Sequence, residues 1–267
     1  MNAMRIALVS AALVISTCQA RADDAPPAIR QFDIETTQRL GRAIYEQDQL
    51  AWKATDVLTA GHSIEELKAA KVHGWIVVTR PDRTLVRFVN DGASGPEVFC
   101  DVAFTPAISS SCATPPSPSL AADELAQYNA RLTAIANVER PCSRRYNSVA
   151  LKDPEHDGWL VWALASTTIP GVVVYGGHYR FTISPDGKSV VQRDALSRSC
   201  SSPQPPDPSQ GVPVALFYTQ LVANTPIETI VWLSLQHKIP IYIATAGNVI
   251  WKVDGDKIVK DAKPGAP

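Results

Sequence analysis

VVVYGGHYRFTISPDGKSVVQRDAL, residues Val172–Leu196, contains two β-rich runs joined by the turn Ser184-Pro185-Asp186-Gly187. Pro185 presets φ for the first central turn position, and Asp186 suits the next position. Gly187 can adopt the left-handed conformation that closes a three-residue hairpin loop with a bulge. This stretch is therefore predicted to be a β-hairpin.

Apolar and polar side chains alternate in the first run of the hairpin. The apolar members are Tyr179, Phe181 and Ile183, and the polar members are His178, Arg180, Thr182 and Ser184. This period is typical of a half-buried antiparallel strand, so we expect one face in a core and the other face in solvent. The preceding Gly176-Gly177 pair indicates a bulge or a close backbone approach.

His178 and Arg180 are the first candidate binding residues. Together they would offer a titratable donor and a permanent cation to an anionic ligand. Two alternatives assign them no function: the polar face is simply solvated, or Arg180 forms an ion pair with Asp194 across the hairpin.

Residues 1–22 have the features of a secretory signal peptide. Arg5 precedes an apolar run, and Ala20-Arg21-Ala22 forms a small-x-small cleavage site. The apolar run is too short to span a bilayer, and no later stretch approaches the roughly 20 apolar residues that a transmembrane helix needs. We therefore expect a periplasmic or secreted protein, cleaved after Ala22, without a transmembrane segment.

Cys18 offers an alternative to simple cleavage, namely a lipid anchor. The sequence Ile15-Ser16-Thr17-Cys18 is loosely similar to a bacterial lipoprotein cleavage site. Such sites have Gly, Ala or Ser before the cysteine, so Thr17 fits poorly. The Ala-x-Ala signature favours cleavage without lipidation.

The overall charge excludes one class of partner. The chain has 25 Lys and Arg and 26 Asp and Glu, and the signal segment contains two of the cations and none of the acids. The mature chain would therefore carry 23 basic against 26 acidic side chains, a net charge of −3. A chain with this charge lacks the basic footprint of a nucleic-acid-binding protein.

Four cysteines remain after cleavage: Cys100, Cys112, Cys142 and Cys200. An even number in an exported chain favours disulfides, and the absence of a Cys-x-x-Cys spacing argues against redox chemistry and against zinc. Three connectivities are possible. We favour Cys100–Cys112, which closes a short loop, and Cys142–Cys200, which would join the end of a helix to the far end of the hairpin.

The Cys142–Cys200 link would also gather positive charge. The cations near it are Arg144, Arg145, Arg193 and Arg198. Such a patch on an acidic protein could bind an anionic glycan, a phosphate or an acidic protein surface. The alternative is that neighbouring acids neutralise it, namely Glu139, Asp153 and Asp194.

Helix signals occur at three places. A long helix is expected to begin at Asp33 and end at Gly61, and a short helix at Ser63, where Glu66 completes a capping box. A third helix covers 121–138, and its expected buried face carries Leu125, Tyr128, Leu132 and Ile135.

Strand signals fill most of the remaining chain. Strands are expected at 74–79, 83–89, 98–104, 146–151, 159–165, 229–235, 239–245, 249–253 and 257–259, whereas 214–222 is ambiguous. Gly247-Asn248 and Asp254-Gly255 are predicted as two-residue turns.

Residues 114–119, with three prolines, are the best candidate linker. They would separate an N-terminal subregion, 23–113, from a C-terminal subregion, 120–260, which a disordered tail follows at 261–267. The predicted fold class is α+β: two helix-plus-antiparallel-sheet subregions stapled by two disulfides.

No motif in the sequence names a reaction. The five histidines lack metal-ligand spacing, no serine lies in Gly-x-Ser-x-Gly, and no glycine-rich phosphate loop precedes a helix. We therefore expect neither a metal nor a cofactor, and a non-enzymatic binding protein for an anionic ligand or a protein partner. The alternative is a hydrolase of a cell-envelope polymer, with His178 as general acid or base and Asp194 orienting it.

Overall fold

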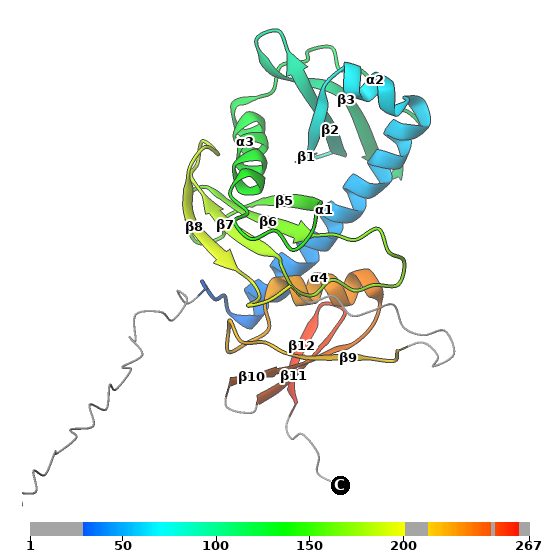
Figure 1. The fold of residues 1–267 in the computed structure, drawn as a ribbon. Helices are drawn as coiled ribbons and strands as arrows, with labels where there is room; N and C mark the ends of the chain where they lie inside the picture. Colours follow the sequence, from blue (N-terminus) through cyan, green and yellow to red (C-terminus); the bar gives the residue numbers. More distant parts are fainter. Residues whose placement is uncertain (1–28, 201–212, 247–248, 262–267) are drawn as a thin grey trace, which may run out of the picture.

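Three sheets are stacked along one long helix, α1 (Ile34–Gly61), in the computed structural model, which describes residues 29–200, 213–246 and 249–261 (Figure 1). Helices and antiparallel-dominated sheets together confirm the predicted α+β class. Both favoured disulfides, Cys100–Cys112 and Cys142–Cys200, are also confirmed. The signal segment 1–22, with Cys18, lies outside the described residues.

The predicted helix starts are confirmed by their capping contacts. Asp33 caps α1, because its side chain accepts a hydrogen bond of 2.7 Å from the backbone N–H of Thr36. Helix α2 (Ile64–Ala69) begins after Ser63, which forms the expected capping box with Glu66. These contacts satisfy backbone N–H groups that have no partner within the helix.

The first sheet follows α2 as a simple meander. Its strands, in spatial order, are β1 (Val72–Thr79), β2 (Thr84–Gly92), β3 (Gly95–Thr105) and β4 (Ala107–Ile108). The proline-rich segment 114–119 continues beside β3, where the N–H of Val98 donates to the carbonyl of Pro118 over 2.7 Å. This segment therefore connects the first sheet to the next helix while it lies along β3.

The second sheet contains the predicted hairpin of residues 172–196. Helix α3 (Ala122–Ala136) precedes β5 (Tyr146–Lys152), β6 (Trp159–Ala165), β7 (Tyr179–Ile183) and β8 (Val190–Ala195). The turn between β7 and β8 contains the predicted residues, with Gly187 at a φ of 78°. The loop is one residue longer than predicted, because the N–H of Ser184 donates to the carbonyl of Ser189 over 2.9 Å. A Cβ at this position would lie 2.1 Å from the carbonyl oxygen of Ala126, so the turn packs directly against α3.

The expectation of a half-exposed β7 is wrong, because both faces of this strand are buried. Tyr179, Phe181 and Ile183 pack in a core with the alanines of α3. The polar face is covered by helix α4 (Glu228–His237), which reaches His178 and Arg180. Polar side chains are tolerated there because they find partners inside the protein.

The predicted buried face of α3 is partly wrong. Leu132 and Ile135 are 46% and 38% exposed, whereas Ala126, Ala130 and Ala134 contact the second sheet. Small side chains allow the helix to approach the sheet closely. The sequence-based pattern gave weight to large apolar residues and therefore rotated the helix away from its real contact face.

The third sheet lies beside the N-terminal end of α1, opposite to the first sheet (Figure 1). Its spatial order is β12 (Lys257–Asp261), β11 (Val249–Asp254), β10 (Ile241–Thr245) and β9 (Leu216–Thr219), with β9 parallel to β10. The two-residue turn before β12 is Gly255-Asp256, one residue later than predicted, because Asp254 pairs with Lys257. The other predicted turn, 247–248, and residues 262–267 of the expected tail lie outside the described residues, whereas Asp261 ends β12.

The prediction of a strand at 229–235 is wrong, because these residues belong to α4. The run TIVWLSL is apolar almost throughout, a pattern that fits either a strand or a fully buried helix. Every residue from Glu228 to Ser234 is buried, and Lys238 ends the helix in a left-handed conformation. Packing on every side therefore decided the type of this element.

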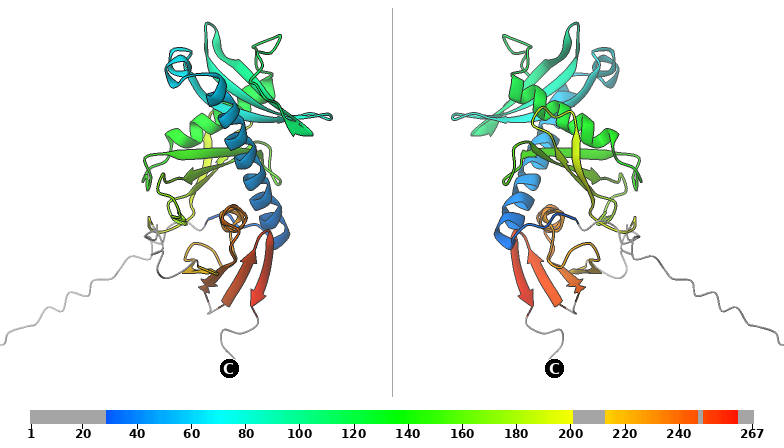
Figure 2. Two further views of the ribbon diagram at one scale, coloured as in Figure 1. Left: turned by 90° about the vertical axis from the view of Figure 1, so that its right-hand side faces the viewer. Right: turned by 90° about the vertical axis from the view of Figure 1, so that its left-hand side faces the viewer.

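Helix α1 contacts all three sheets and α4 (Figure 2). The predicted C-terminal subregion, 120–260, contains two of the three sheets, the second and the third. Over the described ranges, no helix has both the length and the apolar character to cross a membrane.

Candidate functional site

A hollow of about 730 Å³ lies beside the Cys142–Cys200 disulfide. We call it the arginine hollow. Its charged and disulfide-bonded wall consists of Glu139, Arg140, Cys142, Arg193, Arg198 and Cys200. Two segments that are distant in sequence, the connection from α3 to β5 and the residues after β8, therefore meet at one concave surface.

The disulfide and one glycine hold this wall together. The Cα atoms of Cys142 and Cys200 are 5.2 Å apart. The hydroxyl of Tyr146 accepts from the N–H of Cys142 over 2.8 Å and donates to the carbonyl of Gly177 over 3.1 Å. A Cβ at Gly177 would lie 2.3 Å from the Cβ of Cys142, which confirms the predicted close backbone approach.

Among its described lining residues, the arginine hollow carries more positive than negative charge. Arg193 pairs with Glu139 over 2.5 Å. Neither Arg140 nor Arg198 has a carboxylate partner among the residues that the structure describes. Two of the three acids expected to neutralise the patch are engaged elsewhere, because Asp153 pairs with Arg30 and Asp194 with Arg180.

The predicted arginine patch is divided by the structure. Arg193 and Arg198 line the hollow, whereas Arg144 and Arg145 do not line it. Arg144, Arg145 and Arg198 are all exposed, so position and not burial separates them. The carbonyl of Arg145 accepts a hydrogen bond from the N–H of Ser166, which anchors the backbone at this place.

His178 is held as a structural side chain. Only 2% of its surface is exposed, and the edge of its ring meets Trp232. The N–H of Ala165 donates to Nδ1 over 3.0 Å, and Nε2 donates to the carbonyl of Val174 over 2.8 Å. Burial lowers the pKa of His178 to about 4, so the ring is neutral. Both ring nitrogens are occupied by backbone groups, and the expected solvated position of His178 is wrong. His178 is nevertheless among the residues that line the arginine hollow, so its role as a binding residue stays a prediction.

Arg180 is equally buried, with 1% of it exposed. It donates to Asp194 over 2.6 Å, which confirms the alternative of a cross-hairpin ion pair, and to Glu228 of α4 over 2.6 Å. Trp162 donates to the same carboxylate of Glu228 over 2.8 Å. Burial lowers the pKa of Arg180, but the two carboxylates outweigh it and keep this pKa above its ordinary value. Arg180 therefore joins β7, β8 and α4 inside the protein.

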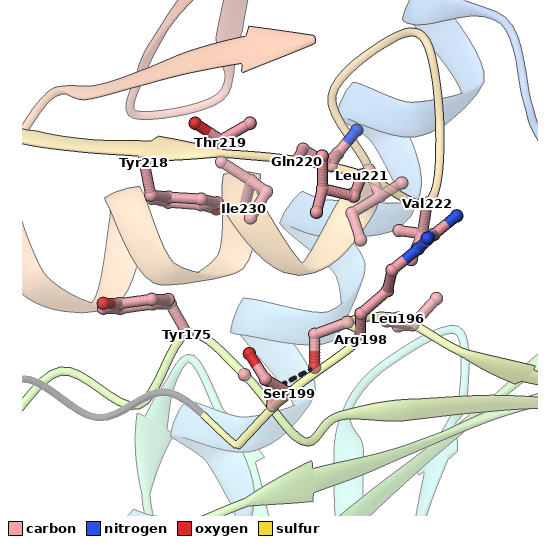
Figure 3. Close-up of a pocket in the computed structure, with 13 residues that line it drawn as sticks. Tyr175, Leu196, Arg198, Ser199, Tyr218, Thr219, Gln220, Leu221, Val222 and Ile230 are labelled. Carbon is pink, nitrogen blue, oxygen red and sulfur yellow. Dashed lines mark hydrogen bonds between the residues drawn. The ribbon is translucent and has the colours of Figure 1, made fainter. Parts of the chain in front are cut away.

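A second hollow of about 250 Å³ adjoins the first and shares Arg198 with it (Figure 3). We call it the tyrosine hollow. Tyr218 of β9 stacks on Tyr175 of the segment before β7, with ring centroids 5.0 Å apart and an interplanar angle of 12°, and the pair lines one end of the hollow. The remaining wall includes Gln220 and the apolar side chains Leu196, Ile227 and Ile230. The two hollows form one cleft between the second sheet and the β9–α4 segment.

Several of these residues were not identified from the sequence. Arg140 lies two positions before Cys142, so the predicted Cys142–Cys200 disulfide could have placed Arg140 beside the other arginines. Tyr218 and Gln220 alternate with exposed Phe217 and Thr219, a period of two within a stretch whose type was ambiguous. Tyr175 carried no such signal, because only the tertiary structure brings it to Tyr218.

Within the described ranges, no group of three or more His, Cys, Asp and Glu side chains is placed to hold a metal ion. The chain matches no protein-family model, no characterised protein and no solved structure with which it was compared. The chemistry of the cleft is therefore the basis on which a function can be assigned.

Proposed function

We propose that this protein is an exported, non-enzymatic binding protein that holds an anionic ligand in the arginine hollow. One observation carries the proposal: Arg140 and Arg198 are permanent cations on a concave wall, and neither has a carboxylate partner in the described part of the chain. The signal-like segment 1–22 and the two disulfides support export.

The surroundings of these arginines favour binding of an anion over solvation alone. Guanidinium groups bind carboxylate, phosphate and sulfate through paired N–H donors. Apolar side chains such as Ile29, Leu221 and Val222 also line the hollow. An apolar wall lowers the local dielectric constant and strengthens the attraction between the cations and a bound anion.

The disulfide supports the same proposal because it limits the movement of both arginines. Arg140 precedes Cys142 by two residues, and Arg198 precedes Cys200 by two residues, so the cross-link keeps the two segments adjacent. A site whose backbone segments are held adjacent before binding loses less conformational entropy when the ligand arrives.

The test is calorimetric titration of the mature chain, beginning at Asp23, with inorganic phosphate and citrate as probes. The double variant Arg140→Gln/Arg198→Gln should bind the better probe at least about tenfold more weakly, since it loses two charge-assisted contacts. The matched control is Arg144→Gln/Arg145→Gln, which removes the same charge from exposed positions near the same disulfide. We expect this control to weaken binding by less than about threefold.

Equal losses in the two double variants would contradict the proposal, because binding would then follow overall charge. Failure of the unaltered chain to bind either probe would also contradict it. Retained circular dichroism and an intact Cys142–Cys200 bond in each variant would show that a loss reflects the site and not the fold.

A further inference from the structure

Two residues that line the tyrosine hollow, Tyr218 and Gln220, each carry a buried polar atom without a hydrogen-bond partner. The side-chain amide nitrogen of Gln220 donates to the carbonyl groups of Ala223, over 3.2 Å, and Thr225, over 2.6 Å. These two acceptors determine which end of the amide carries the nitrogen. Oε1 of Gln220 is therefore directed away from them, and it is buried without a hydrogen-bond partner in the protein.

The hydroxyl of Tyr218 is the second such atom. It is buried and has no partner in the protein, and burial raises the pKa of Tyr218 well above its ordinary value. This hydroxyl therefore remains protonated and can both donate and accept. Among the described residues, one other buried side-chain atom is unpartnered, Oε1 of Gln47 in α1, which does not line either hollow. Two of three such atoms thus belong to residues that line one small hollow.

The rest of the hollow restricts the charge and size of a ligand. None of its described lining residues is Asp or Glu, and Arg198 lines it as well (Figure 3). An ammonium group would meet a guanidinium with no compensating carboxylate. A hydroxyl group, in contrast, can donate to Oε1 of Gln220 without carrying charge. The volume of about 250 Å³ is at the lower end for ligand sites and suits a single small ring.

From this arrangement we infer that the ligand belongs to the sugar acids: a small ring that carries a carboxylate and several hydroxyl groups. The carboxylate binds Arg198, hydroxyl groups bind Gln220 and Tyr218, and the C–H surface of the ring packs on Leu196 and Ile230. This inference rests on the proposed function, since Arg198 belongs to both hollows. It adds the hydroxyl groups as a requirement that the arginine hollow alone does not impose.

Three probes separate the two requirements. Glucuronate carries both the charge and the hydroxyl groups, glucose lacks the charge, and cyclohexanecarboxylate lacks the hydroxyl groups. We expect glucuronate to bind the mature chain at least about tenfold more tightly than either of the others, measured by calorimetry or by ligand-observed NMR.

Tyr218→Phe is the decisive variant, because it removes a hydroxyl that contacts no protein group. It should weaken glucuronate about fivefold, leave cyclohexanecarboxylate unchanged and preserve or raise the melting temperature. Tyr242→Phe is the matched control, since Tyr242 lies on the neighbouring strand β10 and does not line the hollow. It should change neither affinity.

The outcomes keep this inference distinct from the proposed function. If glucuronate and cyclohexanecarboxylate bind equally, or if Tyr218→Phe does not weaken glucuronate, the sugar-acid inference is overturned. A melting temperature lowered by Tyr218→Phe would also overturn it, because the hydroxyl would then have a partner in the protein. Binding of phosphate or citrate that depends on Arg140 and Arg198 would in each case leave the proposed function standing.

Discussion

Acidification should destabilise this protein through His178, by an amount that the structure specifies. The ring accepts from the N–H of Ala165 and donates to the carbonyl of Val174, an arrangement that only the neutral imidazole can make. Burial lowers the pKa of His178 from 6.5 to about 4 in the folded state. The unfolded chain therefore binds a proton at a pH where the folded chain does not.

The direction and size of the effect follow from this difference in pKa. Above pH 6.5 the contribution of the neutral ring to the free energy of unfolding is complete. It is lost progressively as the pH falls from 6.5 to about 4, and no further loss arises below that value. Since one pKa unit corresponds to about 1.4 kcal/mol, the loss attributable to His178 is about 3 kcal/mol.

The assay is urea unfolding of the mature chain with its disulfides intact, followed by tryptophan fluorescence across this pH range. His178→Gln is the comparison variant, because its amide retains a donor and an acceptor but does not titrate. Between neutral pH and pH 4 the unaltered chain should lose about 3 kcal/mol more than the variant. Other titratable groups, such as Asp48, whose pKa is raised by burial, are present in both proteins, so their contributions cancel in the difference.

Parallel pH profiles for the two proteins would refute this reasoning. They would mean that His178 takes up its proton equally well in the folded and unfolded states, so that its ring is not confined to the neutral form. The hydrolase hypothesis would then regain a titratable group that can exchange protons with a substrate.

Three further variants test other parts of the structure. Arg180→Met should lower the free energy of unfolding by about 3 to 5 kcal/mol in urea titrations, because it leaves two buried carboxylates without their cation. The control Arg83→Met removes an exposed ion pair and should change this free energy by less than about 0.5 kcal/mol. Similar losses in the two variants would contradict a buried ion-pair network. Gly187→Ala should cost about 2 kcal/mol or more in the same assay, since its positive φ and the adjacent backbone of α3 exclude a Cβ; an unchanged midpoint would show that the turn can move away from α3. Cys142→Ser/Cys200→Ser should lower the free energy of unfolding by about 4 kcal/mol, since the bond closes a loop with a sequence separation of 58 residues. It should also weaken binding in the arginine hollow. Unchanged binding would show that the hollow forms without the cross-link.

The parts of the fold that were predicted correctly depend on local chemistry. Asp33 and Ser63 cap helices because their side chains satisfy nearby backbone N–H groups, a contact that needs only three or four residues of sequence. Gly187 occupies a left-handed turn position for an equally local reason. The two disulfides follow from the number of cysteines and their positions relative to these elements.

The candidate site was predicted only where it depends on the disulfide. Arg193 and Arg198 line the arginine hollow because the Cys142–Cys200 bond brings their segment to the end of α3. His178 and Arg180 were assigned to a solvated face, which α4 in fact covers. That error follows directly from the interpretation of α4 as a strand, since no helix was then available to bury β7.

By itself, the sequence determined the caps, the central turn and the α+β class, because each depends on backbone geometry or on residues that the chain brings close. It favoured the correct disulfide pairing among three connectivities, which the tertiary structure then decided. Only the tertiary structure decided that 228–237 is a helix, that both faces of β7 are buried and that Tyr175 meets Tyr218. The physical reason is that an apolar run or a polar side chain has no fixed environment of its own. Its conformation and its exposure depend on which distant surfaces pack against it.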